Sequence, residues 1–350
     1  MSDLIDHLST TRSSQNGQFD GLSLAGMDLT ECRFSGCSFK ATDMSKASLN
    51  KSIFVSCDFT QTKLTAADLS NVVFQACTFG ETDATEVVLA GAIIAKSELE
   101  KVDFGRANLQ ELAFDQSSLV SVSFNGANLI KAALLKTQID RCDFSGADLR
   151  RATMTGLDLQ TCTFKGSQLG EAYFEGSNLS GHAFEDCELK GAIFYKAILQ
   201  RVDLAKRELQ SVFFSHADLT SAKFQSANLK QVSFEQALVD QSDFTGAQLN
   251  ACVLPGVSAK DAVFEGASLT KVVLTGADLS GSVWRAAALS SCELSKAKLD
   301  GADFSQATLQ KVNLHDASQH QTVWDKAILS DVKGTDPERL AAEKWQPPSN

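Results

Sequence analysis

The sequence has 350 residues and a formal net charge of −11 at pH 7. This acidic balance argues against direct binding to DNA or to an anionic membrane surface. No run of about 18 apolar residues is present that would predict a transmembrane helix. The N-terminal segment also lacks the apolar core of a secretory signal. The sequence therefore predicts a cytoplasmic protein without a membrane span.

The chain begins with a polar segment and then enters a repeat that persists to residue 330. Residues 1–18 lie outside the repeat and predict an N-terminal cap or a disordered tail. From Phe19 to Leu329, the residues whose numbers end in 4 or 9 are Leu, Phe, Ile, Val, Met or Trp, and the only exceptions are Ala84, Ala259 and Gln319. The residue two places earlier is nearly always small. Residues 19–330 are therefore expected to form one repetitive domain.

A period of five residues fits neither an α-helix nor a flat strand. It fits a chain that turns after every five residues and sends one large and one small side chain inward from each side. Small beside large lets neighbouring side chains pack at the density of a protein core. A second, fourfold longer period is also present, because every fourth large residue from Leu29 to Leu329 is Leu. Four sides of five residues therefore make one square coil.

Words such as CDFSG and ADLRR, which form residues 142–151, make the sequence resemble the pentapeptide-repeat family. The unit of that family is A(D/N)LXX with Leu or Phe at its centre. The resemblance implies an all-β fold: a right-handed quadrilateral parallel β-helix, here a solenoid of about 16 coils with a short C-terminal capping helix.

Two segments depart from the repeat. Pro255–Ala259 places Pro in a stacked coil and Ala at a large position, which predicts a bulge or kink, since Pro cannot donate to a ladder. Arg207 stands where a small inward residue belongs, so its guanidinium is expected to turn outward or to pair with an acid. Each departure is interpreted as a local distortion, with a binding feature as the alternative.

The C-terminal segment, residues 331–350, predicts a capping helix and tail. Asp336, Pro337 and Glu338 form a helix start, with a polar N-cap, Pro in the first turn and an acid near the positive end of the helix dipole. Leu340 or Trp345 is expected to cover the last large residue of the repeat, Leu329. The alternative is a dimerisation helix, which the resemblance implies for relatives that carry such a helix.

The sequence offers no constellation of catalytic residues, no metal site and no cofactor motif. All nine Cys occupy the small inward position, which predicts buried free thiols. Seven Asp residues share one column of the repeat, which favours hydrogen bonding at the corners: Asp43, Asp83, Asp103, Asp143, Asp203, Asp243 and Asp303. We therefore expect a protein that is not an enzyme.

One outward column is apolar where the repeat should be polar. It predicts a face for self-association or for a protein partner, with strand propensity on a partly covered face as the alternative. Its candidate interface residues, with one neighbour, are Ile53, Val73, Ile93, Tyr173, Ile193, Tyr195, Phe213, Val253 and Val273. The favoured function is a non-enzymatic interaction scaffold, of bacterial type, that binds protein partners or forms a homodimer. A secretion-system accessory or effector is one such role among relatives.

The alternative function is a DNA mimic. The resemblance implies it, because some pentapeptide-repeat proteins are acidic rods that bind bacterial DNA gyrase or topoisomerase and confer fluoroquinolone resistance. The column of seven Asp residues is the feature in favour. Lys and Arg residues on the outside of the repeat, such as Lys51 and Lys131, stand against it.

Overall fold

The computed structural model describes residues 10–345. The chain is an all-parallel β-solenoid of about 16 turns, followed by one short helix at the C-terminus, and this confirms the predicted fold class. Within the described residues, no helix is long and apolar enough to cross a membrane. Residues 1–9, half of the predicted N-terminal cap or tail, lie outside the described part. In the other half, Ser13–Gln15 already pair with Arg33–Ser35 in the solenoid.

A backbone ladder between successive coils holds each side of the solenoid. The N–H of Phe39 donates to the carbonyl of Asp58 at 2.8 Å, and the N–H of Asp58 donates to the carbonyl of Cys37 at 3.0 Å. A third bond, from the N–H of Thr42 to the carbonyl of Phe39 at 3.1 Å, closes the turn at the corner. The five-residue word therefore supplies one ladder segment and one turn.

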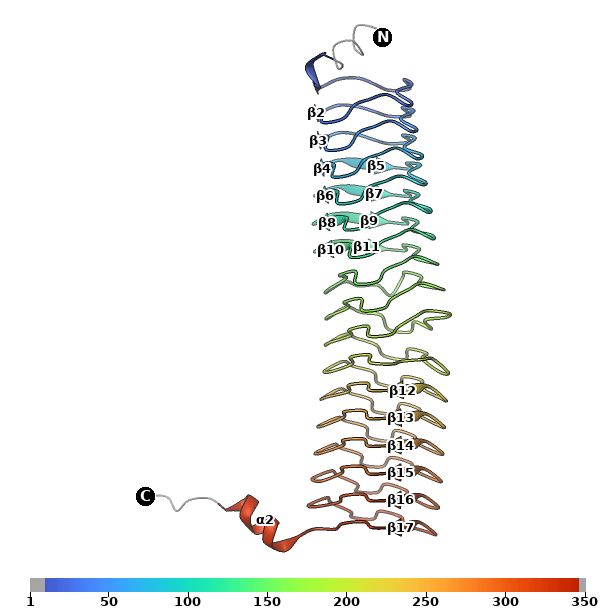
Figure 1. Cartoon of the computed structure of the whole chain (residues 1–350), viewed down its shortest axis with the longest axis vertical. Coiled ribbons are helices and arrows are strands. Elements are labelled where there is room, and N and C mark those ends of the chain that lie inside the picture. Colours follow the sequence, from blue (N-terminus) through green and yellow to red (C-terminus); the bar gives the residue numbers. More distant parts are fainter. Residues whose placement is uncertain (1–9, 346–350) are drawn as a thin grey trace, which may run out of the picture. The chain divides into compact units, whose positions relative to one another are not determined.

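Contacts divide the chain into two compact units. The first unit runs to Asn178 and includes Phe184–Glu188. It holds two parallel sheets, in which consecutive strands pair in register (Figure 1). The seven-stranded sheet consists of β1 (Ser13–Gln15), β2 (Arg33–Ser35), β3 (Ile53–Val55), β4 (Val73–Gln75), β6 (Ile93–Ala95), β8 (Ala113–Asp115) and β10 (Ala133–Leu135). The four-stranded sheet consists of β5 (Thr78–Gly80), β7 (Glu98–Glu100), β9 (Ser118–Val120) and β11 (Gln138–Asp140).

The second unit comprises Leu179–Ala183 and the chain from Leu189 onward. Its six-stranded sheet carries the column of Leu residues that defines the longer period of the sequence. The strands are β12 (Asn228–Lys230), β13 (Gln248–Asn250), β14 (Ser268–Thr270), β15 (Ala288–Ser290), β16 (Thr308–Gln310) and β17 (Ile328–Ser330). In both units the remaining sides are held by isolated parallel bridges between equivalent residues of successive coils.

The core consists of stacked layers of like side chains, as the repeat predicts. In the first unit, Phe54 stacks between Phe34 and Phe74, with ring centroids 4.9 Å and 5.0 Å away. In the second unit, Phe264 stacks on Trp284 at 4.1 Å, and both side chains are fully buried. Aromatic rings stacked at this spacing contribute more than their buried area alone.

Polar side chains at the small inward position donate hydrogen bonds to backbone carbonyls of the preceding coil. The hydroxyl of Thr42 donates to the carbonyl of Phe19, in the preceding coil, at 2.7 Å. Ser52 and Cys252 use the same bond, to the carbonyls of Leu29 at 2.7 Å and Leu229 at 2.8 Å. Ser, Thr and Cys can therefore replace Ala in the core without leaving a buried donor unpaired.

The corners use left-handed backbone in a way that the sequence does not predict. From residue 16 to residue 331, every residue whose number ends in 1 or 6 has φ between +50° and +80°, apart from Thr161. Many of these residues are Lys, Glu or Gln, although non-glycine residues uncommonly adopt this region. Most corner N–H groups are used in the ladder, as in the bond from Ala41 to Thr60 at 2.9 Å, which offsets the strain of about 1–2 kcal/mol.

The predicted distortion at Pro255–Ala259 is wrong. Pro255 and Gly256 are the two central residues of an ordinary corner, which the N–H of Val257 closes by donating to Leu254 at 3.3 Å. Pro at the first central position and Gly at the second is the preferred composition of a type II turn. The ladder does not use the backbone nitrogen of this position, so Pro costs it no bond. Ala259 is fully buried.

The backbone at Arg207 is also regular. Its N–H donates to Leu204 at 3.3 Å and its carbonyl accepts from Asn228 at 2.9 Å. The side chain is half-buried, and its Nε has no hydrogen-bond partner in the described structure. The pattern instead lapses at residues 182–184, where Phe184 has φ of +42°. His182 fills a small inward position there, and its ring is larger than the Ala, Cys or Ser found in other coils.

Helix α2 (Pro337–Lys344) begins where the sequence predicted, with the Asp336 side chain accepting from the N–H groups of Glu338 and Arg339. Its predicted packing on Leu329 is wrong, because Leu329 remains 53% exposed and Trp345 69% exposed. The helix contacts the side of the preceding coils instead, through an ion pair of 2.8 Å between Glu343 and Lys296. Ion pairs and hydrogen bonds at the N-cap therefore hold the helix, in place of the apolar contact with Leu329 that was expected.

The stacked core predicts that substitutions at two adjacent residues of one strand differ sharply in their effect on the free energy of unfolding. Phe54→Ala removes a ring from the middle of a stack and should lower the free energy of unfolding by about 3–5 kcal/mol. Ile53→Ala, on the outer face of the same strand, should change it by less than about 1 kcal/mol. Denaturant unfolding followed by tryptophan fluorescence and circular dichroism measures both. Similar losses in the two variants would contradict the packing described here.

Candidate functional site

The outer face of the seven-stranded sheet in the first unit is apolar over five consecutive strands. Ile53, Val73, Ile93, Ala113 and Ala133 are direct partners in the parallel ladder. Beside them lies a second column: Val55, Gln75, Ala95, Asp115 and Leu135. We call these ten residues the β3–β10 face. Its most exposed apolar side chains are Ile93 and Leu135, each 43% exposed.

Tyr173, a further candidate of the same column, lies apart from this face. Ala133 pairs with Thr153, and Thr153 pairs with Tyr173, so a polar residue separates the tyrosine from the apolar strands. Tyr173 is 45% exposed. The structure therefore brings Ile53, Val73 and Ile93 together and leaves Tyr173 isolated.

The second unit carries a smaller apolar patch from the same column. Ile193 pairs with Phe213, which is 46% exposed. Tyr195 lies beside them, with its ring edge-on to His216 at 5.2 Å and the Lys196 ammonium 5.0 Å from its centroid. Val253 and Val273 pair with each other, and Ser233 separates them from Phe213. The patch is therefore two pairs rather than one continuous stripe.

Two sets of exposed apolar residues were missed by the sequence analysis. Ile198 and Leu238, 41% and 45% exposed, occupy the neighbouring column of the second unit, with Asp218 between them. The same search for apolar residues at outward positions would have found them. The last coil also exposes Val323, Ile328 and Leu329, and within the described residues no strand pairs with the outer edge of β17. This open end could not be predicted, because the sequence placed α2 over it.

The aspartates of the candidate DNA-mimic column serve the corners. Each accepts a hydrogen bond from the backbone N–H two residues later, as in Asp43 with Ser45 at 2.9 Å. The Ser45 hydroxyl and N–H lower the pKa of Asp43. The other members make the same bond: Asp83, Asp103, Asp143, Asp203, Asp243 and Asp303. In the first unit, Lys63 separates Asp43 from Asp83 along the ladder, so positive charge interrupts the column.

The cysteines are free thiols inside the core, as the repeat predicts. Eight of the nine are buried, and Cys187 is half-buried. A hydrogen bond to the Cys57 thiol, together with burial, raises the pKa of Cys37 well above its usual range. A thiol that stays protonated is a poor nucleophile and a poor metal ligand. Among residues 10–345, no group of three His, Cys, Asp or Glu residues is arranged to hold a metal ion.

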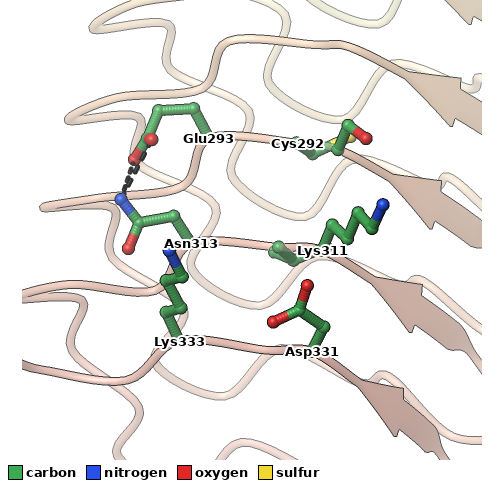
Figure 2. A pocket seen from close by; sticks show the side chains of 8 residues that line it. Cys292, Glu293, Lys311, Asn313, Asp331 and Lys333 are labelled. Carbon is green, nitrogen blue, oxygen red and sulfur yellow. Dashed lines mark hydrogen bonds between the residues drawn. The ribbon is translucent and has the colours of Figure 1, made fainter.

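A polar pocket of about 370 Å³ lies on the second unit near its C-terminal end (Figure 2). Asn313 donates two hydrogen bonds to the carboxylate of Glu293, at 2.8 Å and 2.9 Å. Lys311 and Lys333 supply positive charge, and Asp331 supplies a second carboxylate. Burial raises the pKa of the lining thiol, Cys292, so it is not an activated nucleophile. The pocket presents balanced charge rather than a paired acid and base.

The fold and these surfaces define a repeat solenoid that presents flat outer faces. Its sequence matches two profiles of one family. One, described as a pentapeptide repeat region, matches residues 27–104, 97–174 and 137–214. The other, described as pentapeptide repeats in eight copies, matches residues 197–236, 242–281 and 287–318. The chain belongs to the pentapeptide-repeat family.

Two solved structures illustrate the similarity. Full-length QnrB1, a plasmid-mediated fluoroquinolone resistance protein, is 18% identical, with a TM-score of 0.28, and the match covers 57% of this chain and 92% of QnrB1. HetL, a pentapeptide repeat protein involved in heterocyst differentiation regulation from the cyanobacterium Nostoc sp. strain PCC 7120, is 20% identical, with a TM-score of 0.21. That match covers 94% of this chain and 96% of HetL. A comparison with curated protein sequences finds no match.

Alkaline pH is expected to destabilise the protein in part through Cys252. Burial raises the pKa of Cys252 from 9.0 to about 11. The unfolded chain ionises this thiol more readily, so its contribution to stability is present below about pH 9 and is lost as the pH rises toward about 11. Between those values, wild type should lose about 2 kcal/mol more stability than Cys252→Ala. Denaturant titrations at both pH values measure this, and equal losses would contradict it.

Proposed function

We propose that this protein is a non-enzymatic, cytoplasmic scaffold that binds other proteins through the β3–β10 face. The observation that carries the proposal is the continuity of that face: five strands in direct register present Ile, Val and Ala outward where the family's repeat places polar residues. Contiguous apolar patches on a protein surface commonly mark interaction sites.

The geometry of the face suits a flat partner. Strands of successive coils repeat at the spacing of a parallel sheet, about 4.8 Å, so the two columns form a regular surface with little relief. β-Branched Ile and Val have few rotamers to lose on binding. Charge is low at the centre, where Asp115 is the one acid among the ten residues, and a partner would therefore desolvate few ionised groups.

Self-association is part of this proposal, with two surfaces that can be separated by experiment. One is the β3–β10 face, and the other is the open end of the last coil. At that end Ile328 is 62% exposed and Leu329 53% exposed, beside the half-buried Trp324. A second copy stacked on this end would cover the apolar layer and pair the outer edge of β17.

The test compares two disruptive variants with a matched control. Ile93→Asp/Leu135→Asp places charges on the β3–β10 face, and Leu329→Asp places one on the open end. Gln138→Asp is the control, because Gln138 is exposed on the other sheet of the first unit. Light scattering and sedimentation over about 1–100 µM protein follow self-association, and affinity capture with crosslinking follows partners.

Wild type and Gln138→Asp should form the same complex, either a homo-oligomer or a complex with one specific protein. Ile93→Asp/Leu135→Asp should weaken that complex at least tenfold. If the complex is lost in Leu329→Asp and kept in the other variants, the protein associates through the open end. The face is not a binding surface if wild type stays monomeric and captures the same proteins as the double variant.

A second candidate is a DNA mimic that binds gyrase, and the aspartate column is the observation in its favour. The column is acidic but interrupted, by Lys63 in the first unit and by Lys223 in the second, where Lys223 lies 3.6 Å from Asp203. Duplex DNA carries one charge per about 1.7 Å without interruption. We therefore expect no effect on gyrase supercoiling at micromolar protein. Inhibition, or protection from a fluoroquinolone, that is lost in Asp83→Asn/Asp103→Asn would favour the mimic instead.

A further inference from the structure

Helix α2 is fastened to the solenoid through a buried histidine. His315 lies at a corner of the second unit and is 2% exposed. Its Nδ1 accepts a hydrogen bond of 3.1 Å from the backbone N–H of Asp336, the N-cap residue of α2. The adjoining residues are held in the same way, because the N–H of Asp316 donates to the Thr335 hydroxyl at 3.1 Å.

The bond to Asp336 requires a neutral imidazole. Nδ1 accepts only through its lone pair, so the ring proton must sit on Nε2. Protonation of Nδ1 would place an N–H directly against the N–H of Asp336, and two donors cannot bond each other. It would also create a positive charge in a buried position, where ionised groups are costly.

The nearest acid makes no hydrogen bond to the ring. Glu343 Oε1 lies 3.8 Å from His315 Nε2, which is beyond hydrogen-bond distance. Both carboxylate oxygens of Glu343 are already occupied, Oε2 by Lys296 and Oε1 by Arg339, each at 2.8 Å. Nε2 itself has no hydrogen-bond partner in the described structure.

We propose that His315 is a pH-sensitive latch: its neutral form pins the N-cap of α2 to the last coils, and its protonation releases the helix. A helix as short as α2 is marginal without tertiary contacts, so it unfolds when it is released. Release uncovers the corner at Ser295, Leu314 and His315, all now nearly buried. This inference does not depend on the proposed scaffold function.

The sign follows from proton linkage. The docked state holds a neutral ring and the released state can bind a proton, so acid favours release. Docking should therefore weaken as the pH falls from about 7.5 to about 5.5. Lys296 and Arg339 lower the pKa of Glu343 to about 2, so this carboxylate stays ionised throughout. The other charged groups at the corner are Glu293, Asp316, Asp336 and Lys344.

The experiment measures amide hydrogen exchange of residues 336–345 in the full chain, corrected for the intrinsic effect of pH on exchange. His315→Asn is the decisive variant, because its side-chain oxygen can accept from Asp336 at any pH. His315→Leu fills the corner without an acceptor. Glu343→Gln tests the ion pairs separately. Strand β16 serves as an internal reference in every sample.

We expect wild type to lose protection in α2 by about tenfold between about pH 7.5 and about pH 5.5, while β16 is unchanged. His315→Asn should stay protected at both pH values, and His315→Leu should be exchanged at both. Glu343→Gln should keep the pH dependence. Two results would overturn the latch: constant protection in wild type, or the same pH dependence in His315→Asn as in wild type.

Discussion

The parallel register between neighbouring coils, which pairs each residue with its counterpart one coil later, is the constraint on which the whole structure depends. Each side of a coil both donates to and accepts from the next coil: the N–H of Phe39 donates to the carbonyl of Asp58, and the N–H of Asp58 donates back to the carbonyl of Cys37. Pairing at this register stacks identical positions on one another, so a small or large residue meets another of its kind in the core. It also stacks the outward positions, and any bias in one outward column therefore becomes a continuous surface.

The same stacking lets the core tolerate polar residues and strained corners. A hydroxyl or thiol at the small inward position finds a carbonyl in the preceding coil, as Thr42 and Cys252 do. A left-handed corner residue such as Lys51 or Lys131 finds an acid one coil away, Glu31 at 3.3 Å and Glu111 at 3.1 Å. Exposed pairs of this kind contribute little individually. Their role is to orient long side chains away from the core at corners where Gly is absent.

The sequence predicts the repeating parts well because a period of five residues leaves few structural options. Phe54, Leu269 and Cys252 are buried as expected, since each position is repeated many times. The non-repeating parts are harder to predict. Pro255 was interpreted through a rule for strands, yet it lies in a turn that favours Pro. The place of α2 depends on single contacts such as His315 with Asp336, for which a repeat gives no signal. The β3–β10 face was found from composition, but its separation from Tyr173 required the register.

Isoleucine methyl groups report directly on whether the β3–β10 face binds protein, as proposed. Ile93 and Ile94 are neighbours on β6, the first 43% exposed and the second 1% exposed. Methyl NMR spectra of isoleucine-labelled protein can be recorded from about 10 to about 300 µM, and with a captured partner, to cover micromolar affinities. If the face binds protein, the methyl signals of Ile53 and Ile93 should shift or broaden while that of Ile94 does not. Unchanged signals from Ile53 and Ile93, under conditions in which the protein demonstrably forms a complex, would contradict it.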